Sequence, residues 1–116
     1  MTQDITEAEI AAVSTAPRIT PADIEANIAS EHYFNAGEIQ SPVYVNGKPT
    51  YCDALNLLTF CVLVLQNGFT VTGESACASP ANYNAEIGKR IARENAVNKI
   101  WPLMGYALKQ RLHDAA

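Results

Sequence analysis

The dipeptide Asn67-Gly68 lies between two β-rich segments, and this arrangement constrains the fold more than any other part of the sequence. Both segments, 55–66 and 69–77, are rich in β-branched and apolar residues. Asn-Gly between two such segments favours a two-residue type I′ turn, because both central residues of that turn need a positive φ. The sequence therefore predicts an antiparallel hairpin in which Gln66 pairs with Phe69 and Val64 pairs with Val71.

This pairing sorts the side chains of the hairpin into two faces. One face is predicted to carry Phe60, Val62, Val64, Phe69, Val71 and Cys77, and the other Cys61, Leu63, Leu65, Thr70, Thr72 and Glu74. The second face is half apolar, so it is expected either to contact another subunit, to be partly covered, or to form an ordinary second core layer. Cys61 and Cys77 fall on opposite faces in this pairing, so no disulfide is expected between them.

The segment before the hairpin predicts one short helix and edge strands. Thr20 can cap a helix that begins at Pro21, and Asp23 completes a capping box. Residues 30–38 are expected to form a short strand. Asn46-Gly47 indicates a turn, and the prolines on either side of it confine any strands there to a sheet edge.

The segment after the hairpin predicts helices. Asn82 or Asn84 can cap a helix that runs to about Ile100, and Pro102 ends or kinks it before a last helix of about ten residues. The buried stripe of the first helix is expected to consist of Ile87, Ile91, Ala92, Ala96 and Ile100. The fold class that results is α+β, a small antiparallel sheet with C-terminal helices packed on one face.

The length of 116 residues fits one domain. Residues 1–18 are expected to be a flexible N-terminal tail, with a short helix around residues 7–13, and residues 19–116 a single α+β domain. No apolar run reaches the roughly 18 residues of a membrane span, and the N-terminus is acidic, unlike a signal peptide. These features predict a cytoplasmic protein with no membrane partner.

The charge is divided unevenly along the chain. Residues 1–74 contain nine acidic and two basic side chains, whereas residues 75–116 contain six basic and three acidic ones. The total of −4 argues against binding a nucleic acid polymer. The basic C-terminal third suggests a local anion site or self-association between unlike faces, and the alternative is two solvated helix faces.

Residues suited to catalysis or to metal binding are scarce. The three cysteines have no C-x-x-C spacing, and the only histidines are His32 and His113. No phosphate-binding glycine loop and no Ser-His-Asp arrangement is present. We therefore expect no enzyme activity, no metal and no cofactor.

The residues that remain suit binding. Tyr83 can stack on a base, Asn95 can both donate to and accept from a base or ribose, and three arginines, Arg90, Arg93 and Arg111, can hold phosphates. The alternatives are a half-buried packing role for Tyr83 and a surface role for Asn95. From the residues alone, the prediction is an anion or partner site near the C-terminal helices.

Two long segments carry a resemblance to a known family. The segment 58–77, LTFCVLVLQNGFTVTGESAC, and the segment 82–103, NYNAEIGKRIARENAVNKIWPL, both resemble small phage and prophage proteins of the gene-product forty-nine / gene sixty-six family. Thr20 to Ser30 also fits, so the resemblance covers roughly residues 20–112.

That family is similar in turn to Thoeris anti-defence protein one. The resemblance implies a phage sponge, active in the host cytoplasm, that sequesters a cyclic ADP-ribose-type signal without cleaving it. It also implies binding of cyclic oligonucleotides by some members and assembly as a homo-oligomer, either a dimer or a hexamer. The pocket residues that it implies correspond to Tyr83, Asn95 and Arg111. The alternative function is a phage protein that inhibits a host protein and binds no small ligand, which an exposed Leu63/Leu65 face without a pocket beside Tyr83 would favour.

Overall fold

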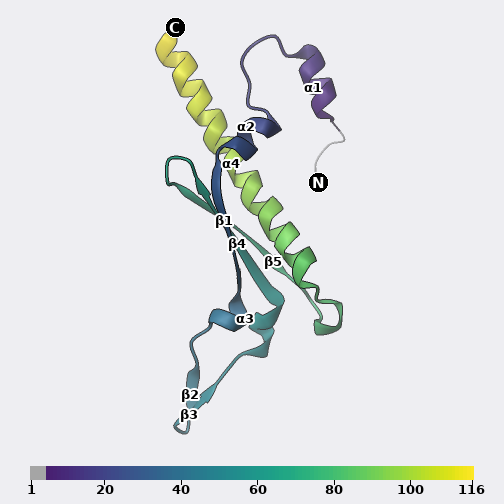
Figure 1. The fold of residues 1–116 in the computed structure, drawn as a ribbon, viewed down its shortest axis with the longest axis vertical. Helices are drawn as coiled ribbons and strands as arrows, with labels where there is room; N and C mark the ends of the chain where they lie inside the picture. Colours follow the sequence, from purple (N-terminus) through teal and green to yellow (C-terminus); the bar gives the residue numbers. More distant parts are fainter. Residues whose placement is uncertain (1–4) are drawn as a thin grey trace.

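The computed structural model describes residues 5–116 and confirms the predicted α+β fold. Three strands form an antiparallel sheet in the spatial order β1–β4–β5, and helix α4 packs on one face of this sheet (Figure 1). The elements are α1 Glu7–Val13, α2 Pro21–Ala26, β1 Ile28–Asn35, α3 Ala36–Ile39, β2 Val43–Val45, β3 Lys48–Thr50, the 3₁₀ helix η1 Asp53–Leu57, β4 Leu58–Leu65, β5 Thr70–Ala76, the 3₁₀ helix η2 Pro80–Asn82 and α4 Ala85–Ala115.

The N-terminal segment contains the predicted short helix, α1. Thr6 and Glu9 close a capping box at its start, and none of its residues is buried. An ion pair between Arg18 and Glu7 links the helix to the chain that follows it. The first four residues of the predicted tail lie outside the described residues, and the division into a tail and one domain stays a prediction.

Helix α2 begins with the predicted capping box. The Thr20 hydroxyl accepts a hydrogen bond from the Asp23 N–H at 3.1 Å, and the Asp23 carboxylate accepts one from the Thr20 N–H at 2.9 Å. The hydrogen bonds that the backbone N–H and then the side chain of Thr20 make to the Asp23 carboxylate lower the pKa of this carboxyl, because they favour its charged form. The helix buries Ile24 against the core and ends where β1 begins.

The hairpin β4–β5 forms as predicted, but the predicted register and turn type are wrong. The Leu65 N–H donates to the Phe69 carbonyl at 2.8 Å, and the Gly68 N–H donates to the Leu65 carbonyl at 2.9 Å. Gly68 has a positive φ of 88°, whereas Asn67 does not and instead accepts a side-chain bond from the Phe69 N–H. The loop therefore has three residues with glycine in the left-handed region, a common alternative to the type I′ turn.

A one-residue change in register turns every side chain of β5 to the other face of the sheet. Val71 and Gly73 therefore lie with Leu63 and Cys61 beneath α4, which corrects the predicted division into faces. Cys61 pairs with Gly73, which lies four residues, or about 13 Å, before Cys77. The two cysteines are therefore too far apart for a disulfide, although the observed register does not turn them to opposite faces as predicted. All three cysteines are free.

Helix α4 continues through Pro102, so the predicted break into two helices is wrong. Proline removes one helical hydrogen bond and crowds the carbonyl four residues earlier, that of Asn98. Both Pro102 and Asn98 are exposed, so water can satisfy the carbonyl that loses its partner. The helix is 31 residues long and extends beyond the end of the sheet (Figure 1).

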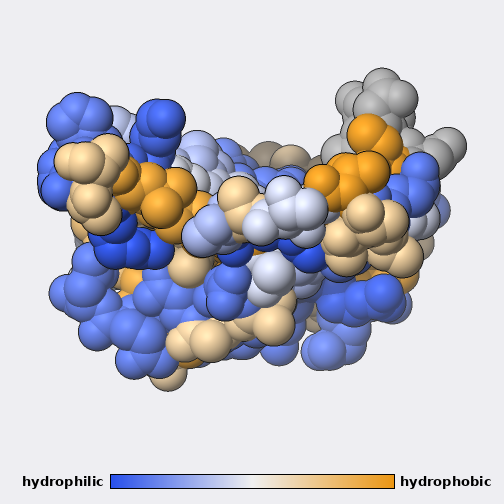
Figure 2. Space-filling model, turned by 90° about the horizontal axis from the view of Figure 1, so that it is seen from above, coloured by the Kyte–Doolittle hydropathy of each residue, from blue (hydrophilic) through white to orange (hydrophobic). Residues whose placement is uncertain are grey.

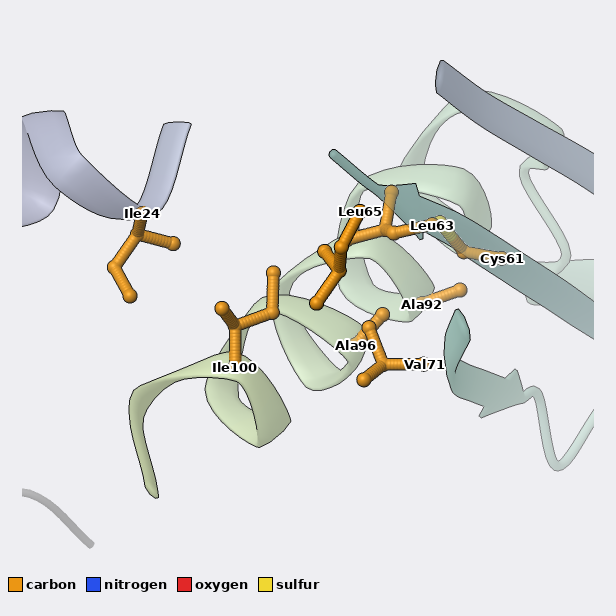
Figure 3. Close-up of a cluster of buried hydrophobic side chains, with 8 residues drawn as sticks. All are labelled: Ile24, Cys61, Leu63, Leu65, Val71, Ala92, Ala96 and Ile100. Atoms are coloured by element: carbon orange, nitrogen blue, oxygen red, sulfur yellow. The ribbon is translucent and has the colours of Figure 1, made fainter. Parts of the chain in front are cut away.

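The contact between α4 and the sheet is made by small residues. A Cβ on Gly73 would lie 2.2 Å from the Ala92 carbonyl oxygen and 2.3 Å from the Ala96 nitrogen, so glycine is required where β5 meets the helix backbone. Gly88, Ala92, Ala96 and Ile100 recur every four residues and form the buried stripe of the helix. Figure 3 shows the alanines and Ile100 facing Leu63, Leu65 and Val71 of the sheet.

This close approach corrects the predicted stripe at its first two positions. Ile87 and Ile91 are 52% and 46% exposed, because the helix turns its glycine and alanines to the sheet instead. The other three predicted members of the stripe, Ala92, Ala96 and Ile100, are buried as expected.

The molecule is elongated. Its extents are 66 × 30 × 19 Å, with the β2–β3 hairpin at one end and the C-terminal part of α4 at the other (Figure 1). The turn of that small hairpin, Asn46-Gly47, has two positive φ values, 52° and 77°, as the turn signal predicted. Seen from the end where α4 terminates, hydrophobic side chains form separate surface patches among hydrophilic ones (Figure 2). Within residues 5–116, no helix is long and apolar enough to cross a membrane.

Candidate functional site

A hollow of about 570 Å³ lies where the end of β1, the two 3₁₀ helices and the start of α4 meet. Its lining combines the rings of Tyr33, Phe34 and Tyr83 with polar and charged groups, namely Asn35, Asn56, Glu38 and Lys89. Cavities of 300–1,000 Å³ that are mainly apolar and carry a few polar groups are typical of small-molecule sites.

Tyr83 is held in place by its hydroxyl. It follows η2 directly, is half-buried, and lies one residue before Asn84, the residue that caps α4. The Asn35 amide donates to the Tyr83 hydroxyl at 3.1 Å, and the Thr59 hydroxyl lies 3.5 Å from it. The ring position is therefore fixed before any ligand enters, which lowers the entropic cost of stacking on it.

Asn35 organises this wall of the hollow. Its amide nitrogen also donates to the Asn56 carbonyl at 2.9 Å, and its amide oxygen accepts from the Gly37 N–H at 2.9 Å, which caps α3. One side chain thus connects β1, η1 and Tyr83 in the segment between η2 and α4. Asn35 was not among the residues predicted from the sequence, where its only signal is its position at the end of a β-rich segment.

Lys89 supplies the cation at the rim of the hollow. Its ammonium group lies 5.9 Å from the centre of the Tyr33 ring and 3.6 Å from the Glu86 carboxylate. The Tyr33 hydroxyl donates to Glu31 at 2.8 Å. Burial and this bond to a carboxylate raise the pKa of the Tyr33 hydroxyl, so it remains a neutral donor at neutral pH.

Arg93, a predicted phosphate ligand, is held by two carboxylates. Its guanidinium lies 2.8 Å from a Glu25 oxygen and 3.0 Å from a Glu31 oxygen, and joins α4 to α2 and β1. The hydrogen bonds that Arg93 donates to Glu25 and then to Glu31 raise the pKa of the arginine, and its bond to Glu31 lowers the pKa of that carboxyl. The side chain is therefore engaged in an ion pair outside the lining of the Tyr83 hollow.

Asn95, a predicted base or ribose ligand, contacts the backbone. Its amide nitrogen donates to the Glu74 carbonyl at 2.8 Å. Strand β5 is at the edge of the sheet, so this bond satisfies a carbonyl of its free edge and ties the strand to α4.

The remaining two predicted ligands lie on α4, and neither of them lines the Tyr83 hollow. Arg90 is exposed on the helix surface. Arg111 lines a different hollow of about 550 Å³ with Arg18 and Asp23, near the far end of the helix. At 1.5 Å per residue, the helix separates Arg111 from its first turn by about 40 Å. One chain therefore does not bring Tyr83, Asn95 and Arg111 together on one small ligand.

Metal-binding groups do not gather in the described part of the chain. Residues 5–116 contain no cluster of three or more histidine, cysteine, aspartate or glutamate side chains that could hold a metal ion.

Comparison with known proteins identifies the family. The model of the Phage protein (N4 Gp49/phage Sf6 gene 66) family matches residues 19–112. The match spans most of the chain, so the chain belongs to this family. No curated protein and no solved structure matches it.

Proposed function

We propose that this phage protein is an anti-defence sponge, which binds a cyclic ADP-ribose-type signalling nucleotide in the host cytoplasm and sequesters it without cleaving it. The observation that carries the proposal is the hollow beside Tyr83, which combines aromatic rings, side-chain amides and a lysine. An adenine needs a π surface and hydrogen-bonding partners for its edge, and a pyrophosphate needs a cation.

The fixed position of Tyr83 suggests a role for each group in the hollow. The adenine stacks on the Tyr83 ring, Asn56 bonds its edge or a ribose, and Lys89 attracts the pyrophosphate. Glu38 also lines the hollow, so the phosphates are expected at the Lys89 side, away from this carboxylate.

The predicted contribution of Arg111 requires a second copy of the chain, whereas Arg90 follows Lys89 at the start of α4. Because Arg111 lies about 40 Å along α4 from the hollow, it reaches a ligand beside Tyr83 only from a neighbouring subunit. The proposal therefore includes a homo-oligomer, a dimer or a hexamer built from dimers, in which the ligand lies near a subunit boundary. Binding of cyclic oligonucleotides, which the resemblance implies for some members of the family, is tested with the same protein.

The alternative, inhibition of a host protein without a small ligand, has less support. That function was predicted to expose the Leu63/Leu65 face and to leave no pocket beside Tyr83. Both leucines are instead buried beneath α4, and the hollow is present.

Isothermal titration calorimetry with cyclic ADP-ribose isomers, and with linear ADP-ribose as a comparison, tests the proposal. We expect micromolar or tighter binding of at least one cyclic isomer. Tyr83→Ala should weaken it about 5- to 150-fold, the worth of one stacked base, whereas Tyr83→Phe should keep most of the affinity. Tyr106→Ala is the matched control, because Tyr106 is 74% exposed on the distal part of α4.

Two results would contradict the proposal. The first is the absence of binding by every isomer at micromolar protein. The second is recovery of a cleaved product after the complex is denatured, since a sponge returns its ligand intact and an enzyme does not.

A further inference from the structure

We propose that Asn56 of η1, held against Gly37 of α3, is the residue that selects adenine over other purines in the hollow beside Tyr83. The inference rests on the proposed function and names the part of the nucleotide that the site reads. Adenine presents an amino donor at N6 next to an acceptor at N7, and an asparagine amide matches this pair with one acceptor and one donor. Guanine presents two acceptors, O6 and N7, at the same edge, and so does hypoxanthine, so one amide cannot satisfy both atoms of either base.

The other side-chain amide in the lining of the hollow, that of Asn35, is already engaged. Its nitrogen donates to the Tyr83 hydroxyl and to the Asn56 carbonyl, and its oxygen accepts from the Gly37 N–H. The bond to Asn56 reaches the backbone carbonyl, so it leaves the Asn56 side-chain amide to the hollow. Asn95, the amide selected from the sequence, donates to a backbone carbonyl of β5 and lies outside this lining.

Gly37 makes room for the Asn56 side chain. A Cβ on Gly37 would overlap the Asn56 Oδ1 and lie 2.7 Å from its Cγ. Gly37 lies in the short helix α3, and alanine adopts a helical conformation more readily than glycine does. The close approach of Asn56 therefore requires glycine here, and the backbone conformation does not.

These two contacts act on different parts of Asn56. The hydrogen bond from Asn35 holds its main chain, and the contact with Gly37 limits where its side chain can lie. An amide that is placed before the ligand arrives loses less conformational entropy on binding. It also cannot move away from a mismatched base, which then buries polar atoms without partners.

The other groups of the hollow do not distinguish one purine from another. An aromatic ring such as that of Tyr83 stacks on any base, and the Lys89 ammonium attracts the phosphates of any nucleotide. The Glu38 carboxylate can accept from the N6 amino group but cannot donate to N7. Recognition of the full adenine edge is therefore assigned to Asn56.

Calorimetry with two ligands that differ only in the base tests the inference. One is the cyclic ADP-ribose isomer that the unaltered chain binds, and the other is its hypoxanthine counterpart, in which oxygen replaces the 6-amino group. We expect the adenine ligand to bind about 5- to 150-fold more tightly. Asn56→Ala should weaken binding of the adenine ligand by that factor and leave the hypoxanthine ligand nearly unaffected, so that the ratio of the two affinities falls to about one.

Gly37→Ala tests how Asn56 is positioned. Its methyl group should displace the Asn56 amide and lower the affinity ratio at least about threefold, whereas a loss of folded protein would lower both affinities alike. In the Asn56→Ala background the same substitution should change the ratio no further. Gly105→Ala is the matched control, because a Cβ there meets nothing within 4 Å, and it should leave the ratio unchanged.

Two further variants separate edge recognition from stacking and from charge. Tyr83→Ala should weaken both ligands by a similar factor and preserve the ratio, because stacking tolerates either base. Glu38→Gln should also preserve most of the ratio, since the Asn56 amide remains.

Three outcomes would overturn the inference. One is equal affinity of the unaltered chain for the two ligands. Another is a ratio that Asn56→Ala preserves and Glu38→Gln removes, which would assign recognition of the base to the carboxylate. The third is a Gly37→Ala protein in which both affinities fall by the same factor. If neither ligand nor any other cyclic isomer binds, the proposed function itself fails, and this inference fails with it.

Discussion

The two faces of strand β4 carry similar apolar side chains but have different surroundings. Cys61, Leu63 and Leu65 are buried beneath α4, whereas Val62 and Val64 are only partly buried and face away from the helix. The difference arises from β5 and α4. Gly73 of β5 and Ala92 and Ala96 of α4 are so small that the backbones of the two elements come into contact on this face of the sheet. Apolar character alone therefore did not decide which face became the core of the single chain.

The largest expected effect comes from closing the space between β5 and α4. Gly73→Val should lower the free energy of unfolding by more than about 3 kcal/mol, because its Cβ would overlap backbone atoms of Ala92 and Ala96 that cannot move alone. Urea unfolding followed by circular dichroism measures the change.

The matched control for this substitution is a glycine with free space. A Cβ at Gly105 meets nothing within 4 Å, and the residue lies inside α4. Gly105→Ala should therefore raise the free energy of unfolding by about 0.5–1 kcal/mol. If Gly73→Val were as harmless as Gly105→Ala, α4 would not pack against β5 as described.

The second prediction compares the two faces directly. Leu63→Ala should cost about 3 kcal/mol, since it leaves a cavity under a fully buried side chain. Val62→Ala should cost about 1 kcal/mol or less when measured at the lowest protein concentration, at which any dimer dissociates. Equal losses of stability at both positions under those conditions would mean that the single chain buries Val62 as completely as Leu63.

The smallest expected effect concerns the ion pairs that join α4 to the β1 side. Arg93 and then Tyr33 lower the pKa of the Glu31 carboxyl in the folded state. Stability from this group is therefore present above the unfolded pKa of about 4.3 and is lost as the pH falls through the lower folded value. Arg93→Met should cost about 1 kcal/mol at pH 7, because these groups are partly exposed.

The pH dependence separates this electrostatic role from simple packing. The free energy of unfolding of the unaltered chain should fall between about pH 5 and pH 3, and it should fall less steeply in Arg93→Met. Some slope should remain in the variant, because the capping bonds of Thr20 also lower the pKa of Asp23. An identical slope in both proteins would show that Arg93 contributes nothing through Glu31.

Local sequence signals predicted several elements correctly. The capping box of Thr20 and Asp23, the cap at Asn84 and the turn at Asn46-Gly47 all form, because each depends on residues within a few positions of one another. The division of β4 into two alternating faces was also correct, since alternation is a property of any strand.

The candidate site was predictable only in part. Tyr83 lines the hollow, as its position before the helix suggested, but its partner Asn35 is 48 residues away in the sequence. Arg93 and Asn95 were selected for their chemistry, and the structure engages them with Glu25, Glu31 and the Glu74 carbonyl. No local spacing pattern in the sequence predicts such long-range partners.

The sequence by itself determined the elements of this protein: a β-hairpin around Asn67-Gly68, capped helices and an α+β fold. Only the tertiary structure decided the register of that hairpin. Two-residue and three-residue loops are both compatible with Asn-Gly, and they pair the two strands in registers that differ by one residue. That choice sets the direction of every β5 side chain and places Gly73 beneath α4. It therefore also decides which side chains of β5 join the core beneath α4 and which point away from the helix.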